Sequence, residues 1–365
     1  MTIIIGVVVV PYHTARTTMA SLRRLVILFI MAVSGVDTFS KTPQRRTLPD
    51  RLLIGYTSSH NLTQVETAVQ QGVNVIIWAF LDIVATDGGG FQAAIIRTHF
   101  DLTAVKECIQ KLDRQGWPHV VHLASFGGWN GPHLDSRLTA EEWYHGGFKK
   151  HLGDTFHGLD WDIEGHDDLT SANNEFSMDC LDKMVAISQM AHADGYIVGM
   201  APPQSYLDIS HNRFSRRVNL TDPHRAWHQK FSYFGENVYA YILAQCSQAI
   251  DFISIQFYES YSRAAMYVAL QPDSDPDDTV TNYLVFYVQA LAARNFTHQV
   301  DFSSDDLLGT AAVATEFPIP LNKLVFGLAN GWASYNREKV FCVSPQQVQV
   351  AWQRLAAQNL APRKK

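Results

Sequence analysis

The segment TFHGLDWDIE, residues 155–164, decides the fold and carries the most informative side chains of the chain. It is apolar over much of its length, which is typical of a strand with both faces buried. Side chains alternate along a strand, so Asp160, Asp162 and Glu164 share one face at a spacing of roughly 6 to 7 Å, while Trp161 and Ile163 point the other way. We therefore predict a buried strand with three stacked carboxyl groups.

Similar apolar runs recur along the chain, at residues 51–57, 73–80, 119–126, 196–203, 251–259 and 324–333. Segments with helical periodicity lie between and after them: one with Thr63 as its N-cap candidate, 102–115, 140–152, a long helix that ends near residue 193, and 346–358. Such alternation predicts parallel strands joined by right-handed crossovers. The fold class is therefore α/β, and a TIM-type (β/α)8 barrel is its natural closure, with the catalytic side at the carboxyl ends of the strands.

A doubly wound open sheet is the alternative fold. It would normally bring a glycine-rich phosphate turn after the first strand, and Tyr56-Thr57-Ser58-Ser59 occupies that place.

The strand count leaves the barrel incomplete, because no apolar run follows the helix at 346–358. An open seam would leave two strand edges unpaired. We expect a truncated or misannotated C-terminus that leaves the barrel without its eighth strand, or closure by another segment. The run IIIGVVVV at residues 3–10 is the only spare strand-like segment.

Composition and charge limit the kind of protein and ligand. The chain has 365 residues, of which 47% are hydrophobic and 18% charged, so residues 41–365 can form one globular barrel domain. A formal net charge of -6, without a block of basic residues, argues against binding to nucleic acid or to an anionic membrane. A neutral or weakly charged ligand fits better, and we expect a monomer.

Residues 1–40 resemble a targeting segment. Arg23 and Arg24 precede the apolar run 25–33, which is followed by small residues, the order of a secretory signal peptide. The apolar run is at most about 12 residues long, against roughly 20 for a membrane span, so an anchor is the alternative. Met19 is a second possible start of translation. The sequons at Asn61, Asn219 and Asn295 also favour a secreted glycoprotein with no membrane contact after signal removal.

The four cysteines, Cys108, Cys180, Cys246 and Cys342, contain no C-x-x-C pair. A zinc site or a thioredoxin-like motif is therefore not indicated. The cysteines could pair in three ways that the sequence does not distinguish, and we expect most to be buried thiols. We expect neither a metal nor a cofactor.

The carboxyl stack itself predicts chemistry. Unpaired carboxylates are costly inside a barrel and repel one another, so at least one should hold a proton near neutral pH. Cleavage of a glycosidic bond needs such an acid, and Glu164 is the outermost of the three. The alternatives are a solvated acidic edge or a divalent-metal site. The residues available for a metal would be Asp160, Asp162, Glu164, His166, Asp167 and Asp168.

Five motifs, in the right order on the right strands, resemble glycoside hydrolase family 18. HGLDWDIE at 157–164 resembles the strand-four signature D-x-x-D-x-D-x-E. The others are Ser125–Trp129 for S-x-G-G, Gly199–Pro202 for M-x-P, Gln256–Tyr258 for Q-x-Y, and Ala79–Phe80 for the A-F pair. The resemblance covers most of residues 51–333. The short link at 334–343 is similar to the compact plant-type class of chitinase.

The resemblance implies a role for each matching residue. Glu164 would be the general acid and base, Asp162 its partner facing the acetamido N–H, and Asp160 the deeper acid that sets the charge of Asp162. Tyr258 would hold the acetamido oxygen. The implied substrate contacts are Tyr56, Phe80, Ser125, Gly127, Gly128, Trp129, Met200 and Gln256, with Tyr56 and Trp129 as stacking candidates. Met200, Tyr206, Trp227, Tyr261 and Trp332 are explained equally well by packing.

The implied activity is that of an endo-acting chitinase, which cleaves β-1,4 bonds between N-acetylglucosamine units in chitin or its oligosaccharides. The mechanism is substrate-assisted and retaining. An endo-β-N-acetylglucosaminidase acting on N-glycans and a chitin-binding lectin remain as alternatives. Two positions depart from the family pattern, namely His157 in place of the first aspartate and Glu259 after Tyr258.

Overall fold

The computed structural model describes residues 4–8, 46–58, 61–86, 94–218, 236–259, 262–271, 276–308, 315–329 and 343–360. Apart from residues 4–8, the predicted signal or anchor region over 1–40 lies outside this part of the chain. So do Asn219, Trp227, Tyr261, Trp332 and Cys342. The predictions made for these positions remain predictions.

Seven parallel strands form the wall of a barrel. They are β2 (Leu53–Thr57), β3 (Val75–Ala85), β5 (Val121–Gly128), β6 (Gly158–Ile163), β7 (Ile197–Met200), β8 (Phe252–Gln256) and β11 (Leu324–Ala329). Each pairs in parallel with the next. The seven predicted runs are thus confirmed as strands, and the parallel barrel replaces the doubly wound alternative.

The seam between the last and first of these strands is occupied by β1 (Ile4–Val8). This segment pairs in parallel with β11, from Ile4 opposite Val325 to Val8 opposite Ala329. It also pairs in parallel with β2, where Ile5 lies opposite Leu53. As predicted, no eighth strand follows β11 within the described residues. The spare run at 3–10 supplies the closing strand, so removal of residues 1–40 as a signal would also remove this closure.

Two antiparallel pairs extend the barrel. The far end of β3 pairs with β4 (Ala94–Thr98), and β9 (Thr297–Gln299) pairs with β10 (Glu316–Pro318). Neither pair was predicted from the sequence.

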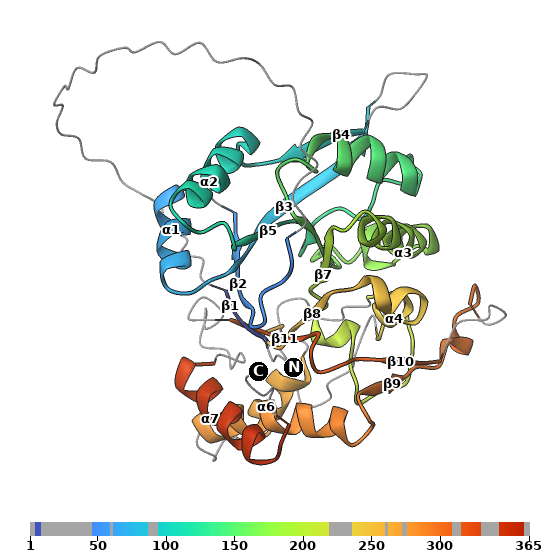
Figure 1. Ribbon diagram of the computed structural model, residues 1–365. Helices are drawn as coiled ribbons and strands as arrows, with labels where there is room; N and C mark the ends of the chain where they lie inside the picture. Colours follow the sequence, from blue (N-terminus) through green and yellow to red (C-terminus); the bar gives the residue numbers. More distant parts are fainter. Residues whose placement is uncertain are drawn as a thin grey trace, which may run out of the picture.

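Helices surround the strands (Figure 1). They are α1 (Leu62–Gln70), α2 (Leu102–Arg114), α3 (Met178–Ala193), α4 (Ala240–Cys246), α5 (Arg263–Ala269), α6 (Pro276–Ala292) and α7 (Pro345–Ala357). Short helical turns are η1 (Glu142–Lys149), η2 (Ala172–Asn174), η3 (Gln204–Tyr206), η4 (Ser247–Ala249) and η5 (Phe302–Ser304). Within the described part of the chain, no helix combines the length and apolarity that a bilayer span requires.

Two of the helix predictions change in detail. The predicted helix at 140–152 is wound as a π-helix over η1. The N-cap of α1 is Asn61 and not Thr63, because the Asn61 side chain accepts hydrogen bonds from the N–H groups of Thr63 and Gln64.

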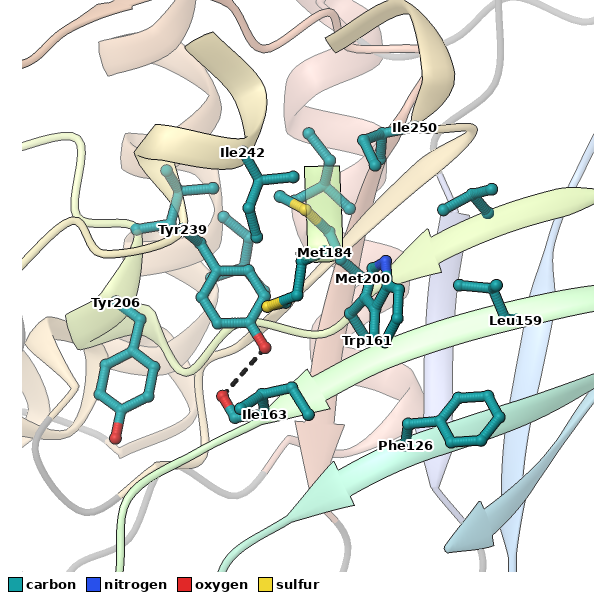
Figure 2. Packing of buried hydrophobic residues seen from close by; sticks show 14 of the residues in the cluster. Phe126, Leu159, Trp161, Ile163, Met184, Met200, Tyr206, Tyr239, Ile242 and Ile250 are labelled. Atoms are coloured by element: carbon teal, nitrogen blue, oxygen red, sulfur yellow. Dashed lines mark hydrogen bonds between the residues drawn. The ribbon is translucent and has the colours of Figure 1, made fainter. Parts of the chain in front are cut away.

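The hydrophobic core has two layers. Small and medium apolar side chains fill the barrel interior, among them Ile54, Ile77 and Leu123. A larger layer packs between strands and helices, where Trp161 lies close to Met200 and Met184 (Figure 2). The described cysteines, Cys108, Cys180 and Cys246, are buried thiols without a disulfide partner in this part of the chain, as expected.

Candidate active site

The carboxyl stack on β6 is arranged as the alternation predicted. Asp160, Asp162 and Glu164 are 0%, 5% and 7% exposed, respectively. Trp161 points the opposite way, into the helix layer, where its indole N–H donates to Ser188 Oγ over 2.9 Å. The three carboxyl groups therefore lie together toward the carboxyl end of a barrel strand, where catalytic groups of this architecture are found.

The glycines of the S-x-G-G motif allow β5 to approach this stack. Gly127 lies opposite Asp162 in the sheet and has a φ of +113°, and a Cβ placed there would be 2.3 Å from the Asp162 carbonyl oxygen. A Cβ on Gly128 would be 2.4 Å from the ring of Phe80. A larger residue at Gly127 would therefore push β5 away from β6, whereas one at Gly128, where φ is +84°, would displace the Phe80 ring.

Asp160 is held by two hydroxyl groups. Its Oδ2 accepts from Tyr56 Oη at 3.0 Å and from Ser125 Oγ at 2.8 Å. Its Oδ1 is buried and has no hydrogen-bond partner among the described residues. Burial raises the pKa of Asp160 to about 6, against the lowering effect of the two hydroxyls. Tyr56 and Ser125 thus contact the carboxyl stack directly.

His157, which replaces the first aspartate of the signature, has a separate partner. Its Nδ1 accepts a hydrogen bond from the N–H of His122 over 2.8 Å. Burial and the charge of Arg46 lower the pKa of His157 to about 3, so its ring is neutral. The substitution leaves both hydroxyl partners of Asp160 in place.

Asp162 and Glu164 form a pair of buried carboxyl groups, each of which changes the pKa of the other. Burial and the neighbouring Glu164 charge raise the pKa of Asp162 well above its ordinary value. Burial also raises the pKa of Glu164 to about 7. Two carboxylates this close cannot both ionise cheaply, so the pair retains a proton near neutral pH.

Gln256, at the end of β8, fixes this pair. Its Nε2 donates to Asp162 Oδ1 and to the Ala201 carbonyl oxygen, each over 2.7 Å, and lies 3.4 Å from Glu164 Oε1. The Q-x-Y motif therefore reaches the stack through its first residue.

Tyr258 lies within electrostatic reach of all three acids. Burial, followed by the charges of Asp162, Glu164 and Asp160, raises its pKa well above the ordinary value. The phenol therefore stays protonated and can donate a hydrogen bond. The Glu259 carboxyl group is hydrogen-bonded to Ser205 instead. It accepts from Ser205 N at 3.0 Å and from Ser205 Oγ at 2.7 Å.

The remaining predicted contacts lie in different surroundings. Trp129 is 41% exposed and follows β5 directly, so its indole is accessible for stacking. Met200 is fully buried in the hydrophobic layer (Figure 2). Tyr206 is also buried, and its hydroxyl accepts a hydrogen bond from the Gly165 N–H. For Met200 and Tyr206 the packing interpretation fits, whereas substrate contact by Trp129 and Phe80 remains a prediction.

Two residues beside the acid could not be predicted from the sequence. His133 bonds to the Glu164 carbonyl oxygen, and Tyr239 bonds to that of Ile163. Neither belongs to a motif, and both approach β6 only through tertiary folding. No local sequence signal could have identified them.

The metal alternative finds no geometric basis among the described residues, where no group of three or more His, Cys, Asp or Glu side chains is placed to hold an ion. Asp167 Oδ2 instead accepts from Asn130 over 2.7 Å. His166 Nδ1 accepts from the Asp168 N–H over 2.9 Å.

A cavity of about 830 Å³ lies at the opposite end of the strands. Its lining includes residues that precede β5 and β6, such as His119 and Thr155, together with Arg46 and Asp113. Those last two side chains form an ion pair with a 2.8 Å contact. None of the stacked carboxyl groups lines this cavity.

No protein-family model and no curated protein sequence matches the chain. Its structure is similar to that of a GH18 chitinase from Pseudoalteromonas aurantia, with a TM-score of 0.37 and 18% identity over 63% of this chain and 74% of that one. A family 18 chitinase from Crocus vernus gives a TM-score of 0.35 and 12% identity over 79% of each chain.

A third similar structure is catalytic domain 2 of an Ostrinia furnacalis Group II chitinase, a mutant in complex with penta-N-acetylchitooctaose. Its TM-score is 0.32 and its identity is 16%, over 67% of this chain and 61% of that one. At such low scores and identities, these similarities assign neither a family nor an activity.

Proposed function

We propose that this protein is a glycoside hydrolase of the chitinase type, resembling family 18. The observation that carries the proposal is the buried pair of Asp162 and Glu164 at the end of β6, both in contact with Gln256 Nε2, with the pKa of Glu164 raised to about 7. A carboxylic acid that keeps its proton near neutral pH is the group that glycosidic cleavage requires. The short link at 334–343 favours the compact plant-type class.

The proposed reaction gives each of these side chains the role that the resemblance to family 18 implies. Glu164 gives its proton to the leaving glycosidic oxygen as the bond to the anomeric carbon breaks. The acetamido oxygen of the same sugar attacks that carbon, forming an oxazolinium ion. Asp162 accepts a hydrogen bond from the acetamido N–H, and Tyr258 donates one to the acetamido oxygen. Water then opens the ion and returns a proton to Glu164, with retention of configuration.

The placement of the two acids on one strand favours this route over a protein nucleophile. Retaining enzymes with a carboxylate nucleophile place it about 5 to 5.5 Å from the acid, across the scissile bond. Asp162 and Glu164 instead lie on one face of the same strand, and Gln256 Nε2 contacts both carboxyl groups. The substrate's own acetamido group is therefore the better nucleophile.

The substrate we propose is chitin or its N-acetylglucosamine oligosaccharides, cleaved internally. Incubation of the purified chain with N-acetylchitohexaose, followed by chromatography of the products, tests this. Shorter chitooligosaccharides are expected. If the protein instead releases glycans from a high-mannose glycoprotein and leaves N-acetylchitohexaose uncleaved, an endo-β-N-acetylglucosaminidase is favoured. Hexamer binding without either reaction would favour a lectin.

Export as a monomeric glycoprotein is part of the same proposal. The sequons at Asn61 and Asn295 are both exposed in the structure. Expression in a secreting eukaryotic host tests this, through the mass of the exported chain before and after glycosidase treatment. Retention of the whole product inside the cell would contradict it.

A further inference from the structure

Three consecutive residues at the end of β6 have their peptide groups hydrogen-bonded by side chains from elsewhere. Tyr239 Oη donates to the Ile163 carbonyl oxygen over 2.9 Å (Figure 2). His133 Nε2 lies 2.9 Å from the Glu164 carbonyl oxygen. The Gly165 N–H donates to Tyr206 Oη over 3.0 Å. The catalytic acid proposed above is the middle residue of this segment.

These bonds begin where the sheet ladder ends. The register between β5 and β6 stops at Ile163, opposite Gly128, and that between β6 and β7 stops at Trp161, opposite Met200. Glu164 therefore lies beyond the last paired residue of its strand. Earlier in β6 the neighbouring strands satisfy the backbone N–H and C=O groups. Beyond the last paired residue, side chains supply these hydrogen bonds, because buried peptide groups need partners.

The chemistry of the partners fixes the state of His133. A carbonyl oxygen only accepts, so His133 must carry a hydrogen on Nε2. Burial lowers the pKa of His133 more than its bond to Glu164 raises it, so the ring is a neutral donor. Its environment is apolar, because the ring centroid lies 4.5 Å from that of Phe176.

Phe176 joins the three side chains into one packed group. Its ring centroid lies 5.7 Å from that of Tyr206 and 6.4 Å from that of Tyr239, both edge-on. The two tyrosine rings are stacked at 6.3 Å. Phe176 is fully buried. Because all four rings pack together, the hydroxyl and imidazole groups have little freedom to leave the backbone they contact.

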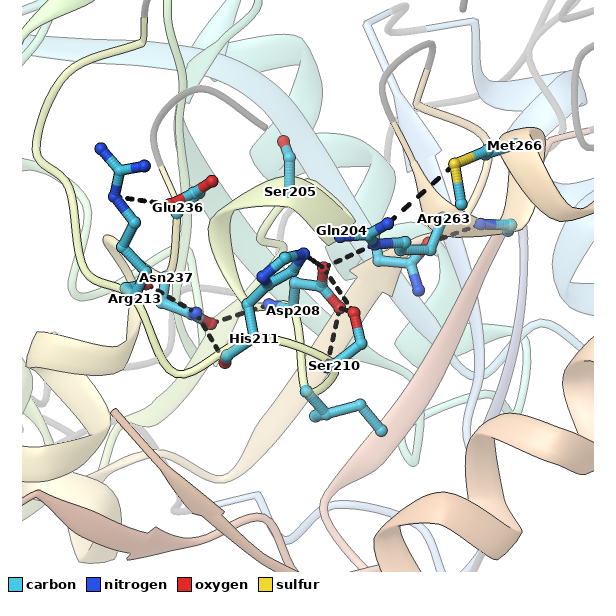
Figure 3. A network of polar contacts seen from close by, with 12 residues as sticks. Gln204, Ser205, Asp208, Ser210, His211, Arg213, Glu236, Asn237, Arg263 and Met266 are labelled. Carbon is cyan, nitrogen blue, oxygen red and sulfur yellow. Dashed lines mark hydrogen bonds and ion pairs between the residues drawn. The ribbon is translucent and has the colours of Figure 1, made fainter. Parts of the chain in front are cut away.

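The two tyrosines are also joined through their backbones. The Tyr239 N–H donates to the Tyr206 carbonyl oxygen over 3.0 Å. Nearby, the Asp208 N–H donates to Asn237 Oδ1 over 2.9 Å, and Arg263 contacts Asp208 Oδ2 at 3.1 Å (Figure 3). The segments that carry Tyr206 and Tyr239 therefore form one hydrogen-bonded unit.

We propose that His133, Tyr206 and Tyr239 form a main-chain clamp that positions the Glu164 carboxyl group against Asp162. They are positioning residues, since they contact the backbone beside the acid and not the substrate. The inference rests on the proposed role of Glu164 as the acid. A loosened backbone would let the Glu164 carboxyl group move toward water, and the loss of burial would lower its pKa toward the ordinary value.

The test compares the Tyr206→Phe/Tyr239→Phe double variant with wild type and with Tyr241→Phe. Tyr241 is a matched control, because it also loses a hydroxyl near the same helix, one that donates to Asp182. The assays are the pH dependence of kcat and KM on N-acetylchitohexaose and a ¹³C carboxyl NMR titration. The Glu164 signal is assigned by its loss in Glu164→Gln.

In the double variant, kcat should fall by about tenfold or more with KM nearly unchanged, because a misplaced acid slows chemistry more than binding. The pKa of Glu164 should fall in the same variant, and Tyr241→Phe should behave as wild type. A folded double variant with wild-type kcat and wild-type Glu164 titration would overturn the clamp.

A second pair of variants tests the histidine. Glutamine can place an amide N–H near the position of Nε2, so His133→Gln should retain the kcat and Glu164 titration that His133→Leu loses. These two histidine variants also test the clamp if the tyrosine double variant fails to fold. Equal behaviour of the two folded variants would overturn the inference. If wild-type protein hydrolyses no substrate, the proposed function fails, and the carboxyl titration alone still decides the clamp.

Discussion

Replacement of Glu164 by glutamine should flatten the pH dependence of stability. Burial raises the pKa of Glu164 from 4.5 to about 7, so the folded protein holds a proton that the unfolded chain has already released between these values. The contribution of the Glu164 proton to folding stability is fully present below about pH 4.5 and is lost as the pH rises through about 7. The free energy of unfolding should therefore fall from pH 5 to pH 8.

The size of this effect follows from the pKa change. One pKa unit corresponds to about 1.4 kcal/mol, and roughly 2 kcal/mol of the Glu164 contribution falls between pH 5 and pH 8. Glu164→Gln removes that contribution and also relieves Asp162 of a charged neighbour. Its free energy of unfolding should thus change less with pH than that of wild type, by about 2 kcal/mol or more.

Reversible urea unfolding at pH 5 and pH 8 measures the difference. Glu107→Gln is the matched control, because Glu107 is exposed on α2 and the substitution is the same. Equal pH slopes for wild type and Glu164→Gln would refute the buried, protonated acid.

Gly127→Ala should lower the free energy of unfolding by more than about 2 kcal/mol in urea, because its Cβ would meet the Asp162 carbonyl oxygen. Gly116→Ala, with a positive φ but no atom near its Cβ, should cost less, and equal losses would contradict the steric argument. Tyr56→Phe should raise the pKa of Asp160 in a carboxyl NMR titration by about one unit, since a hydrogen bond to a charged group is lost; an unmoved signal would show that the phenol does not stabilise the carboxylate. Chitosan should resist hydrolysis, because its de-acetylated sugars lack the nucleophile, and rates equal to those on chitin would exclude substrate assistance.

Local sequence patterns predicted the barrel wall and its carboxyl face. The seven strand runs and the alternation of Asp160, Asp162 and Glu164 with Trp161 depend only on the period of a buried strand. The glycines of the S-x-G-G motif were also predictable, because β5 approaches the carboxyl strand closely. A Cβ on Gly127 would collide with the Asp162 carbonyl oxygen.

What the sequence could not predict depends on contacts between distant segments. The pairing of β1 with β11 joins residues near opposite ends of the chain, and no periodicity specifies that partner. Likewise, Tyr56 was a stacking candidate, but the folded chain turns its hydroxyl onto Asp160. His133 and Tyr239 reach the acid from loops, so their placement follows from packing and not from a motif.

The most direct test of the central claim is the turnover of N-acetylchitohexaose by Glu164→Gln, with its affinity for the same ligand measured by calorimetry. The substitution removes the proton donor and little bulk. Hydrolysis should be abolished, while the dissociation constant stays within about tenfold of the wild-type value. Wild-type turnover in this variant would show that Glu164 is not the acid.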